Sequence, residues 1–277
     1  MDISIILLTH NTKNLVRECI KNIKHASPRL RYEIILVDNA SSDGTVAALQ
    51  NEFPEMQIIA SATNTGFGVG NNLGLQKAQG RYACIFNPDI TVLPGSLEKL
   101  FAYMESHSRV GLAGPKLLNA DHTLQYSCFR FPSVMMPIYR RTPLGGFGFA
   151  QRAADRFLLK DYDHTEPQAV DWLMGGALIA RMEAVRAVGL LDSRYFLYYE
   201  DIDWARTFWS RGWEVHYVPD APMIHLHQRD SAQGNLLASL TRRGTRIHIR
   251  AAIKYYLKWG LDTKRPIYGG PAIPRAA

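Results

Sequence analysis

The first third of the chain alternates short runs of β-branched and apolar residues with segments that have a helical period. This alternation is typical of successive βαβ units, and such units build a parallel sheet. It predicts strands at residues 3–9, 32–38, 56–61 and 81–86, and helices between them at 13–26, 43–52 and 70–78. We therefore expect an α/β fold with a doubly wound, mostly parallel central sheet that is flanked by helices.

The remainder of the chain adds fewer regular segments. It predicts a helix at 94–106, a strand at 111–117, an apolar segment at 170–180, a helix at 200–211 and a short strand at 213–218. A stretch rich in Pro, Gly and Arg at 131–166 is expected to be a long loop. Because these strands are too few for an independent sheet, residues 1–230 are expected to form one domain.

The last predicted helix, at 236–259, carries basic side chains at intervals of four, namely Arg242, Arg246, Arg250, Lys254 and Lys258. This spacing places them on one broad face of a helix. A basic amphipathic helix can lie on an anionic membrane surface, but a charge run can equally be a solvated face, and the sequence leaves both open. Residues 231–277 are expected to be a basic helix and tail that belong to, or pack on, the same domain.

The net charge of +7 favours polyanionic partners such as phosphates, anionic lipids or nucleic acid, and does not choose among them. The three cysteines, Cys19, Cys84 and Cys128, lack the spacing of a zinc or redox site, so we expect reduced thiols in a cytosolic protein. The N-terminus runs directly into the first strand, so no signal peptide is expected. The apolar runs are shorter than the roughly 20 residues that a membrane-spanning helix needs.

Polar side chains follow the predicted strands of the sheet. In doubly wound sheets ligands bind beyond the carboxyl ends of the strands, where this chain places Thr9, Asn11, Asp38 and the segment 87–89. Asp89 has the oxygen ligands that Mg²⁺ or Mn²⁺ takes, but it also suits a turn before a helix. Asp38 can accept a hydrogen bond from a base or ribose, or can form an Asx turn.

Residues 64–72 are rich in glycine and lead into a helix, so their amides can approach a phosphate or a base closely. A plain flexible loop is the alternative. The segment follows the third strand rather than the first and lacks the dinucleotide-binding spacing, which argues against an oxidoreductase.

Three acids lie in residues 200–203, directly after the aromatic run 195–199. Burial against aromatic rings and like-charge crowding both raise carboxylate pKa values, which suits a general base. The alternative is a set of acids that complements a helix dipole. Further along, His225 and His227 form a His-x-His pattern that suits a metal or phosphate contact, although a single histidine is more often structural.

Taken together and in this order, these segments resemble family 2 glycosyltransferases of the GT-A fold, in particular the bacterial rhamnosyltransferase-like members. The resemblance spans roughly residues 3–230 and is highly specific as an ordered set. The matching segments are 5–11, 35–45, 64–74, 87–89, 171–177, 200–203 and 211–213.

The resemblance implies a role for each of these positions. Asp201 would be the catalytic base, with Glu200 beside it, and Asp89 and His225 would hold a divalent metal, Mg²⁺ or Mn²⁺. In place of the family's Asp-x-Asp metal motif this chain has Asn87-Pro88-Asp89, which removes one charge. The nucleotide would contact Thr9, Asn11, Asp38, Asn64, Asn71 and Asn87. The acceptor or the sugar would contact Trp172, Gly175, Gly176 and Tyr199.

The implied activity is inverting glycosyl transfer in one in-line displacement, with a nucleotide diphosphate as the leaving group. By resemblance the donor is dTDP-L-rhamnose, or another dTDP- or UDP-linked sugar. The acceptor would be a saccharide, free or polyprenyl-linked, in bacterial surface polysaccharide synthesis. The enzyme would be cytoplasmic, with peripheral contact at the inner face of the membrane through the basic helix.

Two other functions stay open on the sequence. A nucleotidyltransferase usually has a glycine-rich, basic phosphate loop after the first strand, where this chain has Thr9-His10-Asn11-Thr12. A non-catalytic protein that binds carbohydrate or an anionic membrane surface would use mainly the basic helix. Nucleic acid binding has only the net charge in its favour, so it is not expected.

Overall fold

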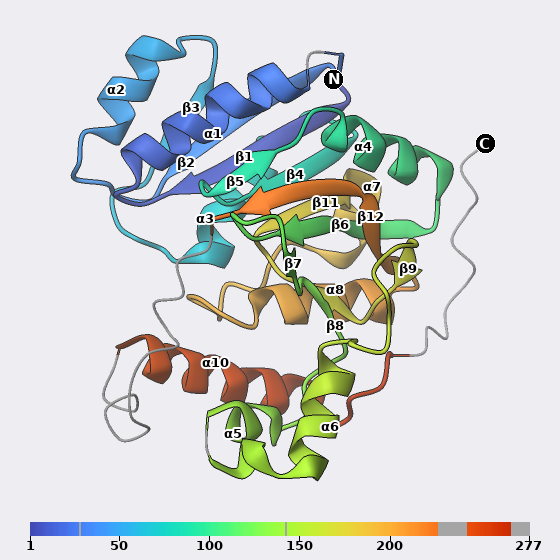
Figure 1. Ribbon diagram of the computed structural model, residues 1–277. Coiled ribbons are helices and arrows are strands. Elements are labelled where there is room, and N and C mark those ends of the chain that lie inside the picture. The colour runs from blue at the N-terminus through green and yellow to red at the C-terminus, as the bar shows by residue number, and fades with distance from the viewer. Residues whose placement is uncertain (28, 142, 227–242, 267–277) are drawn as a thin grey trace.

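The computed structural model describes residues 1–27, 29–141, 143–226 and 243–266 (Figure 1). Its centre is a ten-stranded sheet with the path β3-β2-β1-β4-β11-β6-β12-β5. The strands of this path are β1 (Ile3–Thr9), β2 (Tyr32–Asp38), β3 (Gln57–Ala60), β4 (Tyr82–Phe86), β5 (Ile90–Val92), β6 (Val110–Leu118), β11 (Ala177–Arg181) and β12 (Glu214–His225). Short strands β7 (Leu124–Gln125) and β9 (Gln168–Ala169) join its edge, whereas β8 (Cys128–Phe129) and β10 (Trp172–Leu173) pair with each other.

The sheet is mostly parallel, which confirms the predicted fold class. β3, β2, β1, β4, β6 and β12 run in one direction, and β11 and β5 run in the other. The chain leaves β1 for β2 on one side and later returns to β4 on the other side. The carboxyl ends of β1 and β4 therefore flank the topological switch point, where ligands bind in open α/β sheets.

Helices cover both faces of the sheet (Figure 1). On one face lie α1 (Lys13–Ala26), α2 (Thr45–Glu52) and α4 (Ser96–Ser106), and on the other lie α3 (Phe67–Leu75), α7 (Met182–Val188) and α8 (Glu200–Ser210). Successive side chains of β1 point to opposite faces, so Ile5 and Leu7 join one core and Ile6 joins the other.

Helix α3 packs unusually close to β1 because glycines face the strand. A Cβ at Gly74 would lie 2.5 Å from Cγ2 of Ile6, and a Cβ at Gly70 would lie 2.5 Å from Cδ1 of Leu8. The glycine-rich stretch thus serves helix–sheet packing, and it brings the start of α3 to the carboxyl edge of the sheet. The sequence predicts that this helix begins at residue 70, but it begins three residues earlier, at Phe67.

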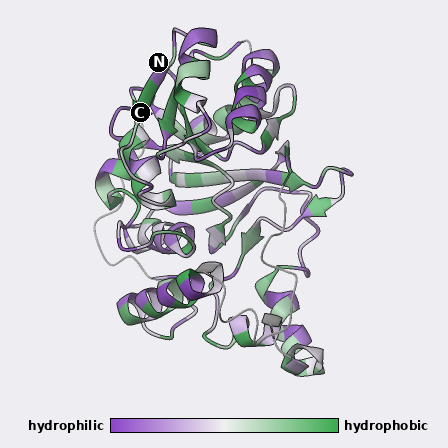
Figure 2. Cartoon of the chain, turned by 90° about the vertical axis from the view of Figure 1, so that its left-hand side faces the viewer, coloured by the Kyte–Doolittle hydropathy of each residue, from purple (hydrophilic) through white to green (hydrophobic). Residues whose placement is uncertain are grey.

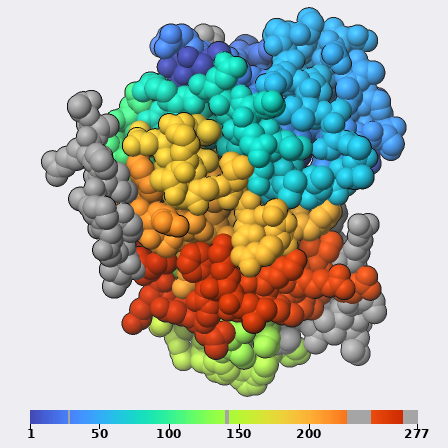
Figure 3. Space-filling model, turned by 180° about the vertical axis from the view of Figure 1, so that it is seen from behind, coloured from blue at the N-terminus to red at the C-terminus, as the bar shows by residue number. Residues whose placement is uncertain are grey.

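A further layer lies beyond α8. It contains α10 (Arg243–Trp259), together with α5 (Met136–Arg141), the 3₁₀ turn η1 (Pro143–Gly146) and α6 (Gly148–Phe157). Hydrophilic and hydrophobic residues alternate along α10 (Figure 2), and from behind the helix forms a band between the residues of α5 and α6 and those of α8 (Figure 3). Arg206 Nη1 donates to the Tyr255 hydroxyl over 3.0 Å, and Lys258 Nζ donates to Asp203 Oδ2 over 2.7 Å.

Two predictions about regular structure were wrong. The stretch at 131–166 is not one long loop, because Ala150 and Phe157 bury one side of α6 and because Pro143 and Gly146 form the 3₁₀ turn between α5 and α6 without interrupting either helix. Strand β12 does not end at residue 218 but continues to His225, with a register shift between Val218 and Met223 that accommodates two prolines. The part of the last predicted helix before residue 243 lies outside the described residues.

The three cysteines are free and buried. Among the helices in the described ranges, none combines the length and the apolar character required to span a bilayer.

Candidate active site

The carboxyl ends of β1, β2 and β4 meet the start of β11 at one edge of the sheet. Thr9 is paired with Asp38, and Phe86 is paired with both Leu7 and Ala177. Neighbouring strands lie about 4.8 Å apart, so Asp38 is about 10 Å from the end of β4. The sequence predicted this gathering of strand ends, and the spacing suits the length of a nucleotide diphosphate.

Asp38 is buried at the end of β2, with 3% of its surface exposed. Its Oδ2 accepts a hydrogen bond from the backbone N–H of Ser41 over 3.0 Å, as in the predicted Asx turn. Its Oδ1 has no hydrogen-bond partner in the described part of the chain. The two interpretations of Asp38 are thus compatible, because one oxygen shapes the turn and the other can accept a bond from a ligand.

Asn11 and Thr9 shape the loop beside Asp38. Asn11 has a left-handed backbone with a φ of 53°, its N–H donates to Ser41 Oγ, and its Oδ1 accepts from the N–H of Ser42. The Thr9 hydroxyl lies 2.8 Å from the Thr12 hydroxyl. Both predicted nucleotide contacts therefore lie at the expected edge, and Asn11 joins the loops that follow β1 and β2.

Asn39 was not among the predicted site residues, although it organises the glycine-rich loop. Its Nδ2 donates to Asn64 Oδ1 over 3.0 Å, and its Oδ1 accepts from the N–H of Thr65 over 2.8 Å. Asn64 Oδ1 also accepts from the N–H of Gly66, so this predicted nucleotide ligand is engaged in holding the loop. Asn71 is fully buried in α3, where its Nδ2 donates to the carbonyl of Phe67 and its Oδ1 has no partner among the described residues.

Asp89 and His225 form a carboxylate–imidazole pair at the end of β4 and β12. Asp89 Oδ1 lies 3.4 Å from Nε2 of His225, whose ring is 3% exposed. His225 Nδ1 lies 2.7 Å from Oε1 of Gln125, and an amide oxygen can only accept, so the ring hydrogen belongs on Nδ1. The other ring nitrogen, Nε2, faces Asp89. The sequence did not predict Gln125 as a site residue, because no motif around it indicates the contact with His225.

The Gly175-Gly176 dipeptide links this pair to Asp201. The Gly176 carbonyl accepts a hydrogen bond from the Asn87 N–H, and a Cβ at Gly176 would lie 3.4 Å from His225 Nε2. On the other side, the Gly175 N–H donates to Asp201 Oδ2 over 3.1 Å. The structure thus brings together Asn87, His225 and Asp201 around two residues that have no side chains.

Asp201 and Glu200 open helix α8 with unusual protonation behaviour. Burial raises the pKa of Asp201 to about 6, although its carboxylate accepts hydrogen bonds from the N–H groups of Gly175 and Ile202. Burial and then the Asp201 charge raise the pKa of Glu200 well above its ordinary range. Glu200 is 4% exposed, and its Oε2 lacks a hydrogen-bond partner within the described chain. Both carboxyl groups therefore bind a proton more tightly than an ordinary carboxyl group does.

The predicted acceptor residues Trp172 and Tyr199 are placed in the core. The Trp172 ring stacks on Phe129 with centroids 4.4 Å apart, and its indole N–H donates to the Arg130 carbonyl. The buried Tyr199 ring meets Tyr255 of α10 at 5.3 Å. Packing contacts therefore account for the positions of both rings. That either ring contacts a sugar stays a prediction.

Metal binding at this edge would depend on few protein ligands. Across the described residues, no group of three or more His, Cys, Asp or Glu side chains is arranged to hold a metal ion. His227 lies outside the described residues, so the second half of the His-x-His pattern is not placed.

Solved structures with the same fold are glycosyltransferases. The mannosyltransferase PcManGT from Pyrobaculum calidifontis, solved with GDP-Man and Mn²⁺, has a TM-score of 0.62 at 19% identity, covering 95% of this chain and 65% of that chain. GalNAc-T7, solved with UDP, GalNAc and Mn²⁺, has a TM-score of 0.62 at 15% identity, covering 87% of this chain and 47% of that one. The fold and the strand-end site define the class of GT-A glycosyltransferases, which use nucleotide sugars.

Within that class, the chain belongs to glycosyl transferase family 2, whose sequence model matches residues 4–158. The N-acetylglucosaminyl-diphospho-decaprenol L-rhamnosyltransferase of Mycobacterium tuberculosis is 27% identical over 261 residues, which cover 87% of this chain and 81% of that protein. The rhamnosyltransferase WbbL of Escherichia coli K12 is 24% identical over 260 residues, which cover 91% of each. The predicted resemblance to rhamnosyltransferase-like members of the family is confirmed.

Proposed function

We propose that this enzyme transfers L-rhamnose from a dTDP-linked donor to a lipid-linked saccharide, with inversion, in the synthesis of a bacterial surface polysaccharide. The names of its relatives support the sugar and the type of acceptor. The observation that carries the proposal is the short link from Asp89 and His225 through Gly175-Gly176 to Asp201. Through this link Asp201, whose pKa is raised, would act as a base beside Asp89 and His225, which are suited to the donor diphosphate.

The donor nucleotide would lie along the ends of β2, β1 and β4. The unpaired Oδ1 of Asp38 would accept a hydrogen bond from a ring N–H of the pyrimidine. Asn87 directly follows β4, and its amide would hydrogen-bond the ribose. The loops held by Asn11 and Asn64 would enclose the base, and the buried Asn71 would act through the start of α3.

Asp89 and His225 fit a divalent metal. Both Mg²⁺ and Mn²⁺ take carboxylate oxygens, and Mg²⁺ is usually held by one or two carboxylates plus substrate phosphates. The softer Mn²⁺ accepts an imidazole nitrogen more readily than Mg²⁺ does, so the pair suits Mn²⁺ better. The Gln125 bond to Nδ1 fixes the tautomer that presents a lone pair at Nε2. When bound, the metal would offset the negative charge that develops on the departing diphosphate.

Asp201 would remove the proton of the acceptor hydroxyl as that oxygen attacks the anomeric carbon. A pKa of about 6 keeps the carboxylate ionised at neutral pH and still basic enough to take the proton. Burial and the Asp201 charge raise the pKa of Glu200, which disfavours a second negative charge next to the donor. The anomeric carbon passes through an oxocarbenium-like state as in glycoside hydrolysis, and a single displacement inverts its configuration.

We further propose a cytoplasmic enzyme that contacts the inner face of the membrane through residues 231–277, packed on a 1–230 catalytic domain. Helix α10 exposes Ile249, Ile253 and Leu257, the last with 82% of its surface accessible. Exposed aliphatic side chains on a basic amphipathic helix are suited to an anionic bilayer surface.

The cationic face is narrower than the sequence predicted. Lys258 turns inward to pair with Asp203 and Asp192, and Lys254 donates to the Arg194 carbonyl. A second set of exposed apolar residues belongs to the α5–α6 region at the same end of the molecule (Figure 1), namely Val134, Met135, Ile138, Leu144, Phe147 and Phe149. Both sets can contact one membrane surface.

The test is transfer from dTDP-L-rhamnose to a short prenyl-diphospho-N-acetylglucosamine, with Mn²⁺, Mg²⁺ or EDTA, and NMR of the product linkage. We expect metal-dependent product with an anomeric configuration opposite to that of the donor. Retention of the anomeric configuration would contradict the single displacement. Turnover only with a different nucleotide sugar would show that dTDP-L-rhamnose is not the donor. Donor binding without transfer or donor hydrolysis would favour the non-catalytic alternative, and release of pyrophosphate from a nucleoside triphosphate would favour a nucleotidyltransferase.

A further inference from the structure

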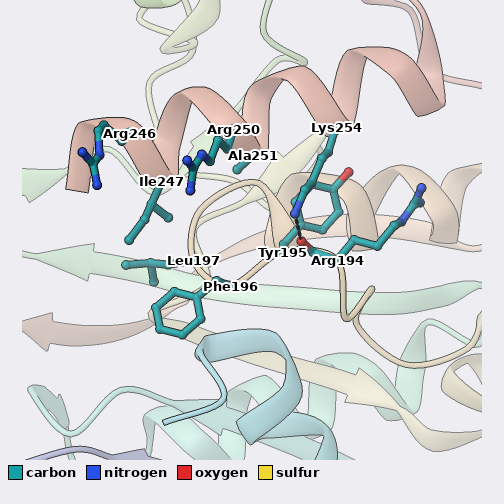
Figure 4. A pocket seen from close by; sticks show the side chains of 9 residues that line it. All are labelled: Arg194, Tyr195, Phe196, Leu197, Arg246, Ile247, Arg250, Ala251 and Lys254. Carbon is teal, nitrogen blue, oxygen red and sulfur yellow. Dashed lines mark hydrogen bonds between the residues drawn. The ribbon is translucent and has the colours of Figure 1, made fainter. Parts of the chain in front are cut away.

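A pocket of about 280 Å³ lies between α10 and the segment that precedes α8 (Figure 4). Arg246, Arg250 and Lys254 line it from α10, and Phe196 and Leu197 line it from the opposite side. None of the described residues that line it is acidic. Its wall is therefore cationic on one side and apolar on the other.

Among the described residues, two of these cations have no neutralising partner. Neither guanidinium, of Arg246 or of Arg250, makes a hydrogen bond or an ion pair within the described part of the chain. They lie one helical turn apart on the side of α10 that borders the pocket (Figure 4). By contrast, Arg194 at the pocket's end pairs with Asp192 at 2.6 Å, and Lys254 is tied to the Arg194 carbonyl at 2.5 Å. Planar guanidinium groups match the geometry of phosphate oxygens.

The apolar wall distinguishes the ligand. A nucleotide or an inorganic phosphate would leave the rings and aliphatic chains of Phe196, Leu197 and Ile247 uncovered. A phosphate ester with a hydrocarbon chain complements both sides of the pocket, because its charge faces the arginines and its chain covers the apolar side chains. The lining therefore matches a prenyl phosphate or diphosphate.

The pocket also connects directly to the proposed base. The Phe196 carbonyl accepts a hydrogen bond from the Phe67 N–H over 2.8 Å. The Phe67 ring lies 3.5 Å from the position of a Cβ at Gly175, whose N–H is bonded to Asp201. The pocket is thus separated from Asp201 by Phe67 and Gly175.

We propose that this pocket, the Arg246–Arg250 pocket, binds the diphosphate and first isoprene units of the lipid-linked acceptor. The sugar attached to that diphosphate then extends past Phe67 to Asp201. The inference rests on the proposed function, because it specifies the acceptor of the same reaction. Anionic phospholipid headgroups share the phosphate chemistry, so the test must separate a substrate diphosphate from a headgroup.

The variant R246Q/R250Q removes both charges and keeps the side-chain bulk. The matched control R186Q/R211Q removes two exposed arginines that do not line the pocket. Both proteins are compared with the parent in detergent, with prenyl-diphospho-N-acetylglucosamine and with an alkyl glycoside that lacks the diphosphate. Thermal unfolding of each protein establishes that both variants are folded.

We expect R246Q/R250Q to raise the KM for the diphosphate acceptor at least tenfold, because hydrogen bonds between charged groups are stronger than those between neutral groups. The KM for the alkyl glycoside should change much less, and R186Q/R211Q should change neither value. Equal KM changes for both acceptors, or no change, would overturn the proposal. A loss of sedimentation with phosphatidylglycerol vesicles while the KM for the short acceptor stays unchanged would assign the pocket to headgroups instead.

Direct binding keeps this test independent of the proposed reaction. Farnesyl diphosphate, measured by calorimetry with farnesol and inorganic diphosphate as references, should bind the parent and R186Q/R211Q at least tenfold more tightly than R246Q/R250Q. If the parent transfers no rhamnose but shows this difference, the proposed function fails and the pocket assignment stands. If rhamnose is transferred and farnesyl diphosphate binds all three proteins equally, the pocket assignment fails alone.

Discussion

Replacing Asp201 with asparagine should make the enzyme slower and more stable at the same time. Burial raises the pKa of this carboxyl group from 3.8 to about 6, so the folded protein binds the proton more tightly than the unfolded chain does. The free energy of unfolding therefore falls as pH rises from 3.8 to 6 and stays reduced above pH 6. The pKa difference corresponds to at most about 3 kcal/mol, and partial solvent contact of the side chain reduces it.

Part of this gain is lost in the variant, because the amide nitrogen cannot accept the hydrogen bond from Gly175 or Ile202, at a cost of about 1 kcal/mol. That cost does not depend on pH, whereas the stabilisation gained by removing the buried charge does. At pH 5 most wild-type molecules are already protonated, so the stabilisation by Asp201→Asn should be about 1.4 kcal/mol smaller at pH 5 than at pH 8. Chemical denaturation at the two pH values measures this difference.

The kinetic effect has the opposite sign. Loss of a general base typically lowers turnover by about 10²- to 10⁴-fold, equivalent to about 3–5 kcal/mol in the barrier. In the wild type, the turnover rate should fall about tenfold per pH unit below pH 6, and in the variant this dependence should disappear. The dissociation constant of the donor should be nearly unchanged, which calorimetry can verify.

Asp203 provides a matched control on the same helix. It is buried too, but its carboxylate accepts hydrogen bonds from Lys258, Trp259 and Tyr195. Asp203→Asn leaves Lys258 without a full partner, so it should lower stability at both pH values. If Asp201→Asn also destabilised the protein equally at pH 5 and pH 8, or turned over like the wild type, the assignment of a buried base would be refuted.

Four further predictions test neighbouring positions. Asp38→Asn should raise the donor KM about 10- to 100-fold, because it alters the one acceptor oxygen left for the base. Gln125→Leu should weaken metal-dependent binding of dTDP by about 10- to 100-fold in calorimetry, because the His225 tautomer is no longer fixed. Gly176→Ala places a Cβ 3.3 Å from the His225 ring and should lower both metal affinity and turnover, with a small change in Tm. Glu200→Gln should shift the kinetic midpoint near pH 6 only slightly, because burial and the Asp201 charge raise the pKa of Glu200 well above its ordinary range; a large downward shift would mean that Glu200 carries a negative charge beside Asp201.

The first half of the sheet could be predicted from the sequence because its signals are local. The bounds of β1, β2 and α1 agree with the prediction residue for residue, since apolar runs and helical periods there end at polar turns. The parallel registers then place Asp38 and the end of β4 at one edge without any knowledge of side-chain contacts. Fold class and strand-end residues follow from period and order alone.

The remaining features depend on partners that are distant in the sequence. The role of Gln125 depends on its hydrogen bond to His225, one hundred residues away. The role of Trp172 depends on its stacking against the ring of Phe129. Asn64 was assigned to the nucleotide because of its position at a strand end, whereas its oxygen serves the loop through Asn39. Aromatic and amide side chains are equally suited to ligands and to packing, and only the folded chain distinguishes the two.

The position of Asp201 depends on the C-terminal helix. Tyr198 and Tyr199, directly before α8, have φ values of 70° and 68°, a left-handed conformation that costs about 1–3 kcal/mol at each non-glycine residue. The Tyr199 ring is held against Tyr255, and Tyr255 in turn accepts a hydrogen bond from Arg206 of α8. Helix α10 therefore stabilises the strained turn that orients the base, and it also provides the arginines of the acceptor pocket. A membrane contact on the outer face of α10 would act on a helix that is already part of the active-site wall, so residues 243–259 should not be separable from the catalytic unit.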